Sequence, residues 1–493
     1  MIKKIRSFLF FNKNLRQTVA KNTFWLSVSN VVGKSLRAII IIYAARVLGA
    51  EGYGVFSYAF GFSAFIMGFS DLGITGILNR ELSKGLGREK KIIATSFFLK
   101  LILSALTYTI TLVAAFTVMP IAAARIVVLI LSFSLFLDGL REFGFGITRS
   151  FQKMEIEAGV TIVYQLGSVI VGLIVFVIWK TPLALAAAYL FGSFLGLVLI
   201  IRYLKEYFRN MREGYDSSLV KSILRDAWPF AITAFGNLIL LYTDTILIGW
   251  LRAEADVGYY SAASKIIQLL NMAPSLFILA LFPALTQKIM AKEAKSIIEK
   301  SLALLVLIGL PIAIGGFLIP GFIIGLVFGK EYALTVPIFR ILILTTIVSF
   351  PSAVVAYSLL AHNKQSKVVK YVLGSAALNL ALNYLLIRRL GNPGAALATL
   401  IAQTITFLGM FYELNKLEKI FTIKPFWRII ASTTVMTMVI LVLKVAGGPL
   451  PLVFGLALLS YLGALKIFRE PLLGEIFDPF KKLIENLKGR SVL

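Results

Sequence analysis

The residues best suited to bind a charged ligand are two cations in a long apolar stretch near the N-terminus. Lys34 and Arg37 lie in the run from Lys21 to Gly49, which is long enough to cross a bilayer. Each charge costs roughly 2.5–3.5 kcal/mol at the centre of a membrane helix, so such side chains usually face a bundle interior or a watery cavity. Asn30 shares their helical face, because the spacing is i, i+4 and i+7. This face is predicted to line a polar chamber that could bind an anion.

A third candidate cation, Lys265, lies in the second half of the chain. It shares a helical face with Gln268 and Met272, and we expect it to join the same ligand site. The alternative for these cations is a structural ion pair with a buried carboxylate. Asp71 and Asp244 are the carboxylates available for such pairs.

Four acidic residues within or beside the apolar segments are candidates for coupling or gating. Asp138, Arg141 and Glu142 can meet on one helical face, since their spacing is i, i+3 and i, i+4. A local salt bridge is expected there, with a gate as the alternative, and Arg141 is also a candidate for binding substrate. Asp71 and Asp244 are candidates for coupling to a proton or sodium gradient, because a carboxyl group in apolar surroundings binds a proton more readily. A structural role is the alternative for both.

The remaining cations within apolar segments are expected to be less important. They lie within about two turns of a segment end, where a long side chain reaches the interface at low cost. These residues are Lys100, Arg125, Arg340, Lys370 and Arg428. With no cysteine and one histidine, the chain excludes thiolate catalysis, disulfides and histidine metal clusters, so no metal site or catalytic residue is predicted.

The elements that must position these side chains are membrane helices. The hydrophobic fraction is 58%, the charged fraction is 15%, and the mean hydropathy is +0.87. We expect an all-α integral membrane protein with about fourteen spans. The predicted spans are 22–45, 53–79, 92–118, 122–147, 158–179, 182–201, 226–251, 257–285, 301–328, 333–361, 368–387, 393–414, 426–446 and 449–467. Proline and glycine between Pro311 and Gly325 predict a kink in the ninth span.

The net charge of +26 follows the loops rather than forming a nucleic-acid stripe. Roughly 34 lysines and arginines fall on the side of the N-terminus and roughly 7 on the other side. Both termini are therefore predicted to be cytoplasmic, in the cell membrane, with the basic side resting on anionic lipid. No nucleic-acid partner is expected.

An internal repeat divides the chain. Leu48–Ala59 resembles Leu251–Ala263, and six spans separate the two copies, so the halves share one orientation. We expect two parallel six-helix lobes around a central cavity, with two extra C-terminal helices. The predicted divisions are a basic interfacial segment 1–21, a first lobe 22–203, a linker 204–225, a second lobe 226–415, an appended pair 424–468 and a basic amphipathic tail 469–493.

Three motifs resemble the polysaccharide flippases, the polysaccharide transporter branch of the multidrug/oligosaccharidyl-lipid/polysaccharide exporter superfamily. The motifs are Ala45–Gly54, then Asp244 with Val257–Lys265, then Gly391–Thr399. The resemblance implies a flippase that moves isoprenyl-diphosphate-linked oligosaccharides across the membrane by alternating access. We expect a monomer, and the sequence predicts no bound cofactor.

Two alternatives remain open. An ion-coupled drug or cation exporter of the same superfamily predicts an acidic, aromatic-lined chamber. A membrane glycosyltransferase needs positioned carboxylates and usually a sizeable extramembrane domain, whereas the longest interior loop here is the 202–225 connector.

Overall fold

The computed structural model describes residues 10, 12, 14–85, 87–209, 211–290, 293–420 and 426–474. Within these ranges the chain forms helices and no strand. The terminal segments 1–9 and 475–493, which carry most of the predicted interfacial sequence, lie outside the described residues.

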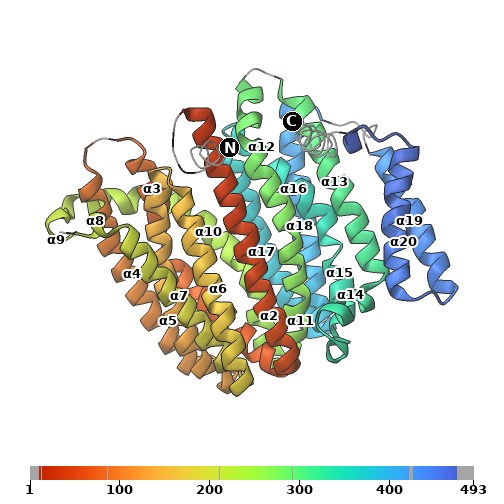
Figure 1. Ribbon diagram of the computed structural model, residues 1–493, viewed down its shortest axis with the longest axis horizontal. Helices are drawn as coiled ribbons and strands as arrows, with labels where there is room; N and C mark the ends of the chain where they lie inside the picture. The colour runs from red at the N-terminus through yellow and green to blue at the C-terminus, as the bar shows by residue number, and fades with distance from the viewer. Residues whose placement is uncertain are drawn as a thin grey trace, which may run out of the picture.

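Two helical bundles and a hairpin follow one another along the chain (Figure 1). The first bundle contains α2 (Leu15–Met67), α3 (Ile74–Leu82), α4 (Glu89–Thr117), α5 (Ala122–Ser150), α6 (Met154–Ile178) and α7 (Pro182–Tyr203). A connector with α8 (Lys205–Phe208) and α9 (Met211–Gly214) leads to the second bundle. The second bundle contains α10 (Ser217–Leu251), α11 (Glu254–Leu270), α12 (Met272–Met290), α13 (Ala294–Leu318), α14 (Pro320–Val327), α15 (Thr335–Leu342), α16 (Thr345–Ala361), α17 (Gln365–Leu390) and α18 (Asn392–Glu418). The hairpin of α19 (Trp427–Val445) and α20 (Leu450–Ile467) packs against α13.

The chain is a multi-pass membrane protein. Twelve described helical segments are long and apolar enough to cross a bilayer, with α11–α12 and α15–α16 each counting as one segment. Helix α2 adds two arms that meet at Gly49, whose φ of 66° is readily adopted only by glycine. The expected number of fourteen spans is compatible with this arrangement.

Three predicted spans are interrupted. The span predicted at 53–79 is wrong as a continuous helix, because α2 ends at Met67 and Gly73, with φ 81°, precedes α3. The span predicted at 257–285 breaks after Leu270, since Pro274 cannot donate to the carbonyl four residues earlier and its ring crowds that carbonyl. The span predicted at 333–361 breaks between α15 and α16.

The kink predicted in the ninth span is confirmed. Helix α13 ends at Leu318 and α14 begins at Pro320, with Ile319 in a non-helical conformation between them. Pro320 occupies the first turn of α14, where its missing N–H would have had no helical partner.

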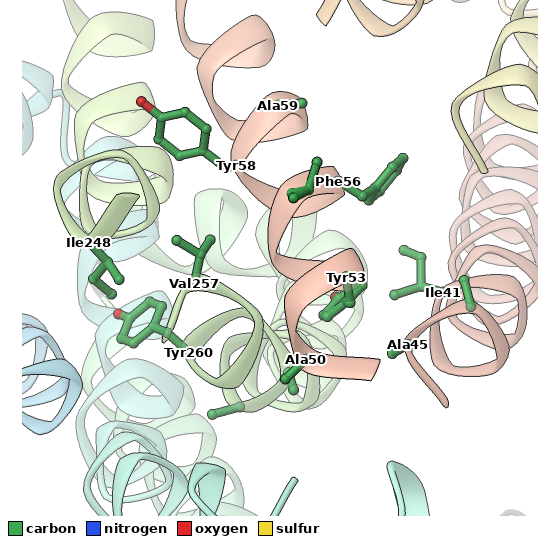
Figure 2. Packing of buried hydrophobic residues seen from close by; sticks show 14 of the residues in the cluster. Ile41, Ala45, Ala50, Tyr53, Phe56, Tyr58, Ala59, Ile248, Val257 and Tyr260 are labelled. Carbon is green, nitrogen blue, oxygen red and sulfur yellow. The ribbon is translucent and has the colours of Figure 1, made fainter. Parts of the chain in front are cut away.

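The two ends of the structure are packed differently. We call the end that holds the α8–α9 connector the connector face, and the end that holds the bend of α2 the Gly49 face (Figure 1). At the Gly49 face one buried apolar cluster includes residues of both bundles, among them Tyr53, Ile248 and Val257. Figure 2 shows the second arm of α2 lying between its first arm and helices α10 and α11 in this cluster. Toward the connector face the two bundles have separate large clusters, and only a small cluster joins α3 to α10. The bundles are therefore sealed together most extensively at the Gly49 face.

Candidate substrate cavity

A central cavity of about 550 Å³ lies between the two bundles. Its walls come from both arms of α2, from α7, and from α10, α11 and α12 of the second bundle, with α15, α16 and α18 completing it. This volume is within the range of small-molecule sites, and the position between two bundles is a common place for such sites.

Three of the predicted cations line this cavity. Lys34 and Arg37 project from the first arm of α2, and Lys265 projects from α11 across the gap. None of the three forms an ion pair with a described residue. Cations without an ion-pair partner in a cavity at membrane depth are suited to bind an anion.

Neutral groups hold two of these cations in place. The Lys265 Nζ donates a hydrogen bond to Gln268 Oε1 at 3.1 Å. The Arg37 guanidinium lies over the Tyr189 ring, 5.6 Å from its centroid. With its amide oxygen turned toward Arg37, Gln165 accepts hydrogen bonds from Arg37 Nη2 at 3.1 Å and Nε at 3.2 Å. These contacts orient the cations without neutralising them.

Asp244, the cavity's carboxylate, is buried and bonded only to neutral donors. It accepts hydrogen bonds from the Tyr260 hydroxyl, from Asn383 Nδ2 at 2.5 Å and from Thr399 Oγ1 at 2.8 Å. Asn383 Oδ1 is buried and has no hydrogen-bond partner among the described residues. Asp244 therefore does not pair with Lys265 or Lys34, and three neutral donors stabilise its carboxylate.

The other predicted residues lie outside the cavity. Asn30 donates to the Leu26 carbonyl of its own helix at 2.9 Å. Arg141 is buried within the first bundle, where Nη1 bonds Asp138 Oδ1 at 2.5 Å and the guanidinium stacks 4.0 Å from the Tyr164 ring centroid. The expected local salt bridge between Asp138 and Arg141 is confirmed as a contact.

Glu142 does not join that pair. Its carboxylate accepts from Arg149 Nη1 at 2.7 Å, and Arg149 also bonds Glu157. Seven residues separate Glu142 from Arg149, so they too share a helical face, and the predicted three-residue cluster is wrong for Glu142.

Asp71 is paired with a cation that we expected at the interface. Lys100 is 2% exposed, and its Nζ lies 2.8 Å from Asp71 Oδ1. Thr75 donates a second hydrogen bond to Asp71 at 2.6 Å. The interruption after Met67 brings Asp71 to Lys100, so the expected interfacial position of Lys100 is wrong.

Sequence reasoning missed most of the cavity wall. Aromatic side chains from both bundles cover it, namely Tyr53, Phe56, Phe60, Tyr189, Tyr242 and Tyr260. The Asn379 and Asn383 pair, spaced i, i+4 in an apolar segment, was a further signal that could have indicated the surroundings of Asp244.

At the Gly49 face the two repeat motifs are in backbone contact. A Cβ atom on Gly54 would lie 1.8 Å from the Glu254 carbonyl oxygen, and one on Gly258 would lie 1.9 Å from the Ala50 oxygen. Only glycine permits this approach of the second arm of α2 to α11. The Tyr332 hydroxyl adds a hydrogen bond to the Ala45 carbonyl at 2.8 Å.

Comparison with solved structures confirms the fold. A structure of the lipid II flippase MurJ in an inward closed conformation superposes with a TM-score of 0.75, at 17% identity, over 91% of this chain and 99% of that chain. An outward-facing multidrug resistance transporter of the MATE family superposes with a TM-score of 0.61, at 14% identity, over 83% of this chain and 100% of that chain.

Sequence comparison identifies relatives with names from glycan export. A Haloferax volcanii protein named as a low-salt glycan biosynthesis flippase is 23% identical over 78% of this chain and 81% of its own length. A Shigella flexneri protein named as an O-antigen transporter is 24% identical over 77% of this chain and 94% of its own length. The MatE family matches residues 229–385. Because the polysaccharide biosynthesis protein family matches residues 19–289, more than half of the sequence, this chain belongs to that family.

Proposed function

We propose that this protein flips isoprenyl-diphosphate-linked oligosaccharides across the cell membrane by alternating access. The observation that carries the proposal is the set of three cations, Lys34, Arg37 and Lys265, that share one cavity without ion-pair partners among the described residues. They come from both bundles, which we equate with the two lobes of the sequence repeat. A ligand bound to all three would therefore bridge the lobes.

The chemistry of a diphosphate fits these groups. A bare diphosphate cannot cross about 30 Å of hydrocarbon, so the protein must replace its water. Arg37 offers a planar fork of donors and the lysines offer compact charges. The aromatic wall provides flat apolar surfaces against which sugar rings could pack, while the isoprenyl tail stays in the bilayer.

Closure of the Gly49 face supports the alternating-access part of the proposal. The joint core and the Gly54 and Gly258 contacts hold the lobes together there, and most of the packing toward the connector face lies within each lobe. In a state that is open at the Gly49 face, α11 would lie apart from the second arm of α2. We place the connector face in the cytoplasm, following the positive-inside expectation, and take the protein to act as a monomer.

Asp244 is the candidate for coupling to an ion gradient. A proton or Na⁺ at this carboxylate would replace the hydrogen bonds that it accepts from Asn383 and Thr399, on helices α17 and α18. Occupancy would therefore change the packing of α10 against these helices. Asp71, Asp138 and Glu142, already paired with cations, are left as structural or gating groups.

An ion-coupled exporter of cationic drugs is the second candidate. The match of residues 229–385 to the MatE family and the buried Asp244 favour it. The three cavity cations argue against it, because they repel a cationic drug.

Binding of a short isoprenyl-diphosphate sugar to purified protein tests the proposal. Lys34→Gln, Arg37→Gln and Lys265→Gln should each weaken binding, and the wild-type affinity should fall as salt rises. Loss of a charge-assisted hydrogen bond costs about 1.5–3 kcal/mol, which corresponds to roughly tenfold to a hundredfold. Arg428→Gln, in α19 outside the cavity, is the matched control and should leave the affinity unchanged. Wild-type affinity in all four variants would refute a diphosphate site in this cavity.

A further inference from the structure

A second cavity, of about 620 Å³, opens at the outer side of the first bundle near the connector face. Helices α4, α5 and α7 form its walls, and α8 and α9 of the connector close one end. In Figure 1 these short helices lie at the edge of the molecule beside α4, with α2 in the middle of the view. The cavity shares no lining residue with the central one, so it is a separate site.

The wall of this cavity is suited to a hydrocarbon chain. Its lining residues are Phe97, Phe98, Leu140, Leu197, Ile201, Phe208, Met211, Arg212 and Glu213. The first seven are apolar, and the two charged residues lie together in α9 at one end. Ile201 is 43% exposed, and the same outward side of α7 carries the exposed Phe194 and Val198. The cavity is thus continuous with the lipid-facing surface of α7.

The connector gives this end of the cavity a positive charge. From Arg202 to Glu213, the part that reaches the cavity, it holds four basic and two acidic residues. Arg202, Lys205 and Arg209 are exposed, and none of them forms an ion pair with a described residue. Clusters of basic residues at the membrane surface attract anionic lipid headgroups, at about 1 kcal/mol per residue.

The connector is also anchored to the first bundle beside the cavity. The Asp216 backbone N–H donates to Thr95 Oγ1 at 3.1 Å, and Lys91 Nζ bonds the Asp216 carboxylate at 3.2 Å. A Cβ atom on Gly214 would lie 3.0 Å from the Ala94 Cβ, so α9 lies close against α4. The rings of Phe97 and Phe208 meet edge to face inside this contact. A ligand in the cavity would therefore touch both α4 and the segment that leads into α10.

We propose that this cavity binds one anionic phospholipid, with an acyl chain between α4, α5 and α7 and its headgroup held by the basic connector. The charge of the connector selects an anionic over a zwitterionic headgroup, and the apolar wall selects a lipid over free phosphate. Since the connector joins the two bundles, the bound lipid would stabilise the connector against the first bundle. This inference does not depend on which substrate the central cavity takes.

Native mass spectrometry of the delipidated full-length protein, titrated with phosphatidylglycerol or phosphatidylcholine, tests the proposal. Wild type should bind one phosphatidylglycerol more tightly than phosphatidylcholine. Arg212→Gln should weaken the binding of phosphatidylglycerol about fivefold and leave the binding of phosphatidylcholine unchanged. Ile201→Trp should fill the groove and abolish the preferred phosphatidylglycerol site, and both variants should keep the wild-type circular dichroism.

Two controls make the outcome specific. Arg225→Gln removes the same charge from the far end of the connector, where the side chain is 76% exposed, and should bind phosphatidylglycerol as wild type does. Arg37→Gln should also keep this site, so failure of the lipid proposal and failure of the diphosphate proposal are distinguishable. The proposal would be overturned if wild type bound phosphatidylglycerol and phosphatidylcholine equally well. It would also be overturned if Arg212→Gln and Arg225→Gln lost the same amount of affinity for phosphatidylglycerol. A further outcome would also overturn the proposal: isoprenyl monophosphate displaces phosphatidylglycerol from wild type at a concentration below that of phosphatidylglycerol, and Ile201→Trp abolishes this binding. The cavity would then be assigned to an isoprenyl tail.

Discussion

The glycines that meet at the Gly49 face allow a direct test of whether their contact closes the cavity at this face. In Gly258→Ala the new methyl group would be placed 1.9 Å from the Ala50 carbonyl oxygen. Carbon atoms prefer neighbours at about 3.5–4.0 Å, so the second arm of α2 and α11 would have to separate locally by roughly 1.5 Å or more. The obstacle is backbone on both sides, which cannot rotate away as a side chain can. Overpacking of this kind typically costs about 1–3 kcal/mol.

That cost falls on one conformation. A state in which the two helices have moved apart does not meet the methyl group, so Gly258→Ala should shift the equilibrium toward opening at the Gly49 face by roughly 5- to 150-fold. Gly54→Ala should act in the same direction, because its Cβ would lie 1.8 Å from the Glu254 oxygen. Gly374→Ala is the matched control, since this helical glycine has no neighbour within 4 Å of its Cβ position.

The assay exploits the absence of cysteine from the chain. A single cysteine at Ser57, which lines the cavity, reports access from the Gly49 face to a membrane-impermeant maleimide. Labelling should be faster in the Gly258→Ala and Gly54→Ala backgrounds than in wild type or Gly374→Ala. Unchanged labelling in folded Gly258→Ala and Gly54→Ala proteins would refute the idea that this backbone contact closes the cavity.

Three further predictions concern carboxylates. Asp71→Asn should lower the free energy of unfolding by about 3 kcal/mol, measured by thermal unfolding in detergent. This is the low end for a broken buried ion pair, because the Asp71 side chain is 36% exposed. Changing Lys100 to Met as well should restore part of the lost stability. Asp244→Asn should keep binding of the isoprenyl-diphosphate sugar but abolish the effect of a Na⁺ or proton gradient on its transport in vesicles; a gradient effect of wild-type size would exclude Asp244 as the coupling group. Hydrogen bonds from Ser218 and the nearby Lys91 ammonium hold the pKa of Asp216 below its usual range, so its stabilising contribution is complete above that range and is lost as pH falls through the lowered pKa. The difference in melting temperature between wild type and Asp216→Asn should therefore shrink in acid, and a difference that grows in acid would contradict this assignment.

Hydropathy and the charges of the loops were enough to predict the membrane class and most of the spans, and the prolines and glycines between Pro311 and Gly325 predicted a kink in the ninth span. They were not enough to place the helix interruptions near Gly73 and between α15 and α16, because the residues on either side of each break are nearly as apolar as those of an unbroken span. Pro274 was a local signal for the third interruption. It marks the point at which α11 gives way to α12.

The candidate site was predicted only in part, because sequence spacing describes one helix at a time. Helical spacing correctly placed Lys34 and Arg37 on the cavity wall, since both belong to one face of one helix. It could not exclude Asn30, which bonds its own backbone, and it could not find the partners of Asp244. Asn383 and Thr399 lie 139 and 155 residues away from Asp244, and only the packing of α17 and α18 against α10 brings them together.

The most direct test of the central claim is translocation of a fluorescent isoprenyl-diphosphate disaccharide in proteoliposomes that contain purified protein. Wild type and Arg428→Gln should move the lipid to the opposite leaflet at similar rates. Arg37→Gln should slow it roughly tenfold to a hundredfold at subsaturating substrate, because the variant lacks the guanidinium that we propose binds the diphosphate. A folded Arg37→Gln, Lys34→Gln, Lys265→Gln triple variant that flips the lipid at the wild-type rate would contradict the assignment of the central cavity as the path of the head group.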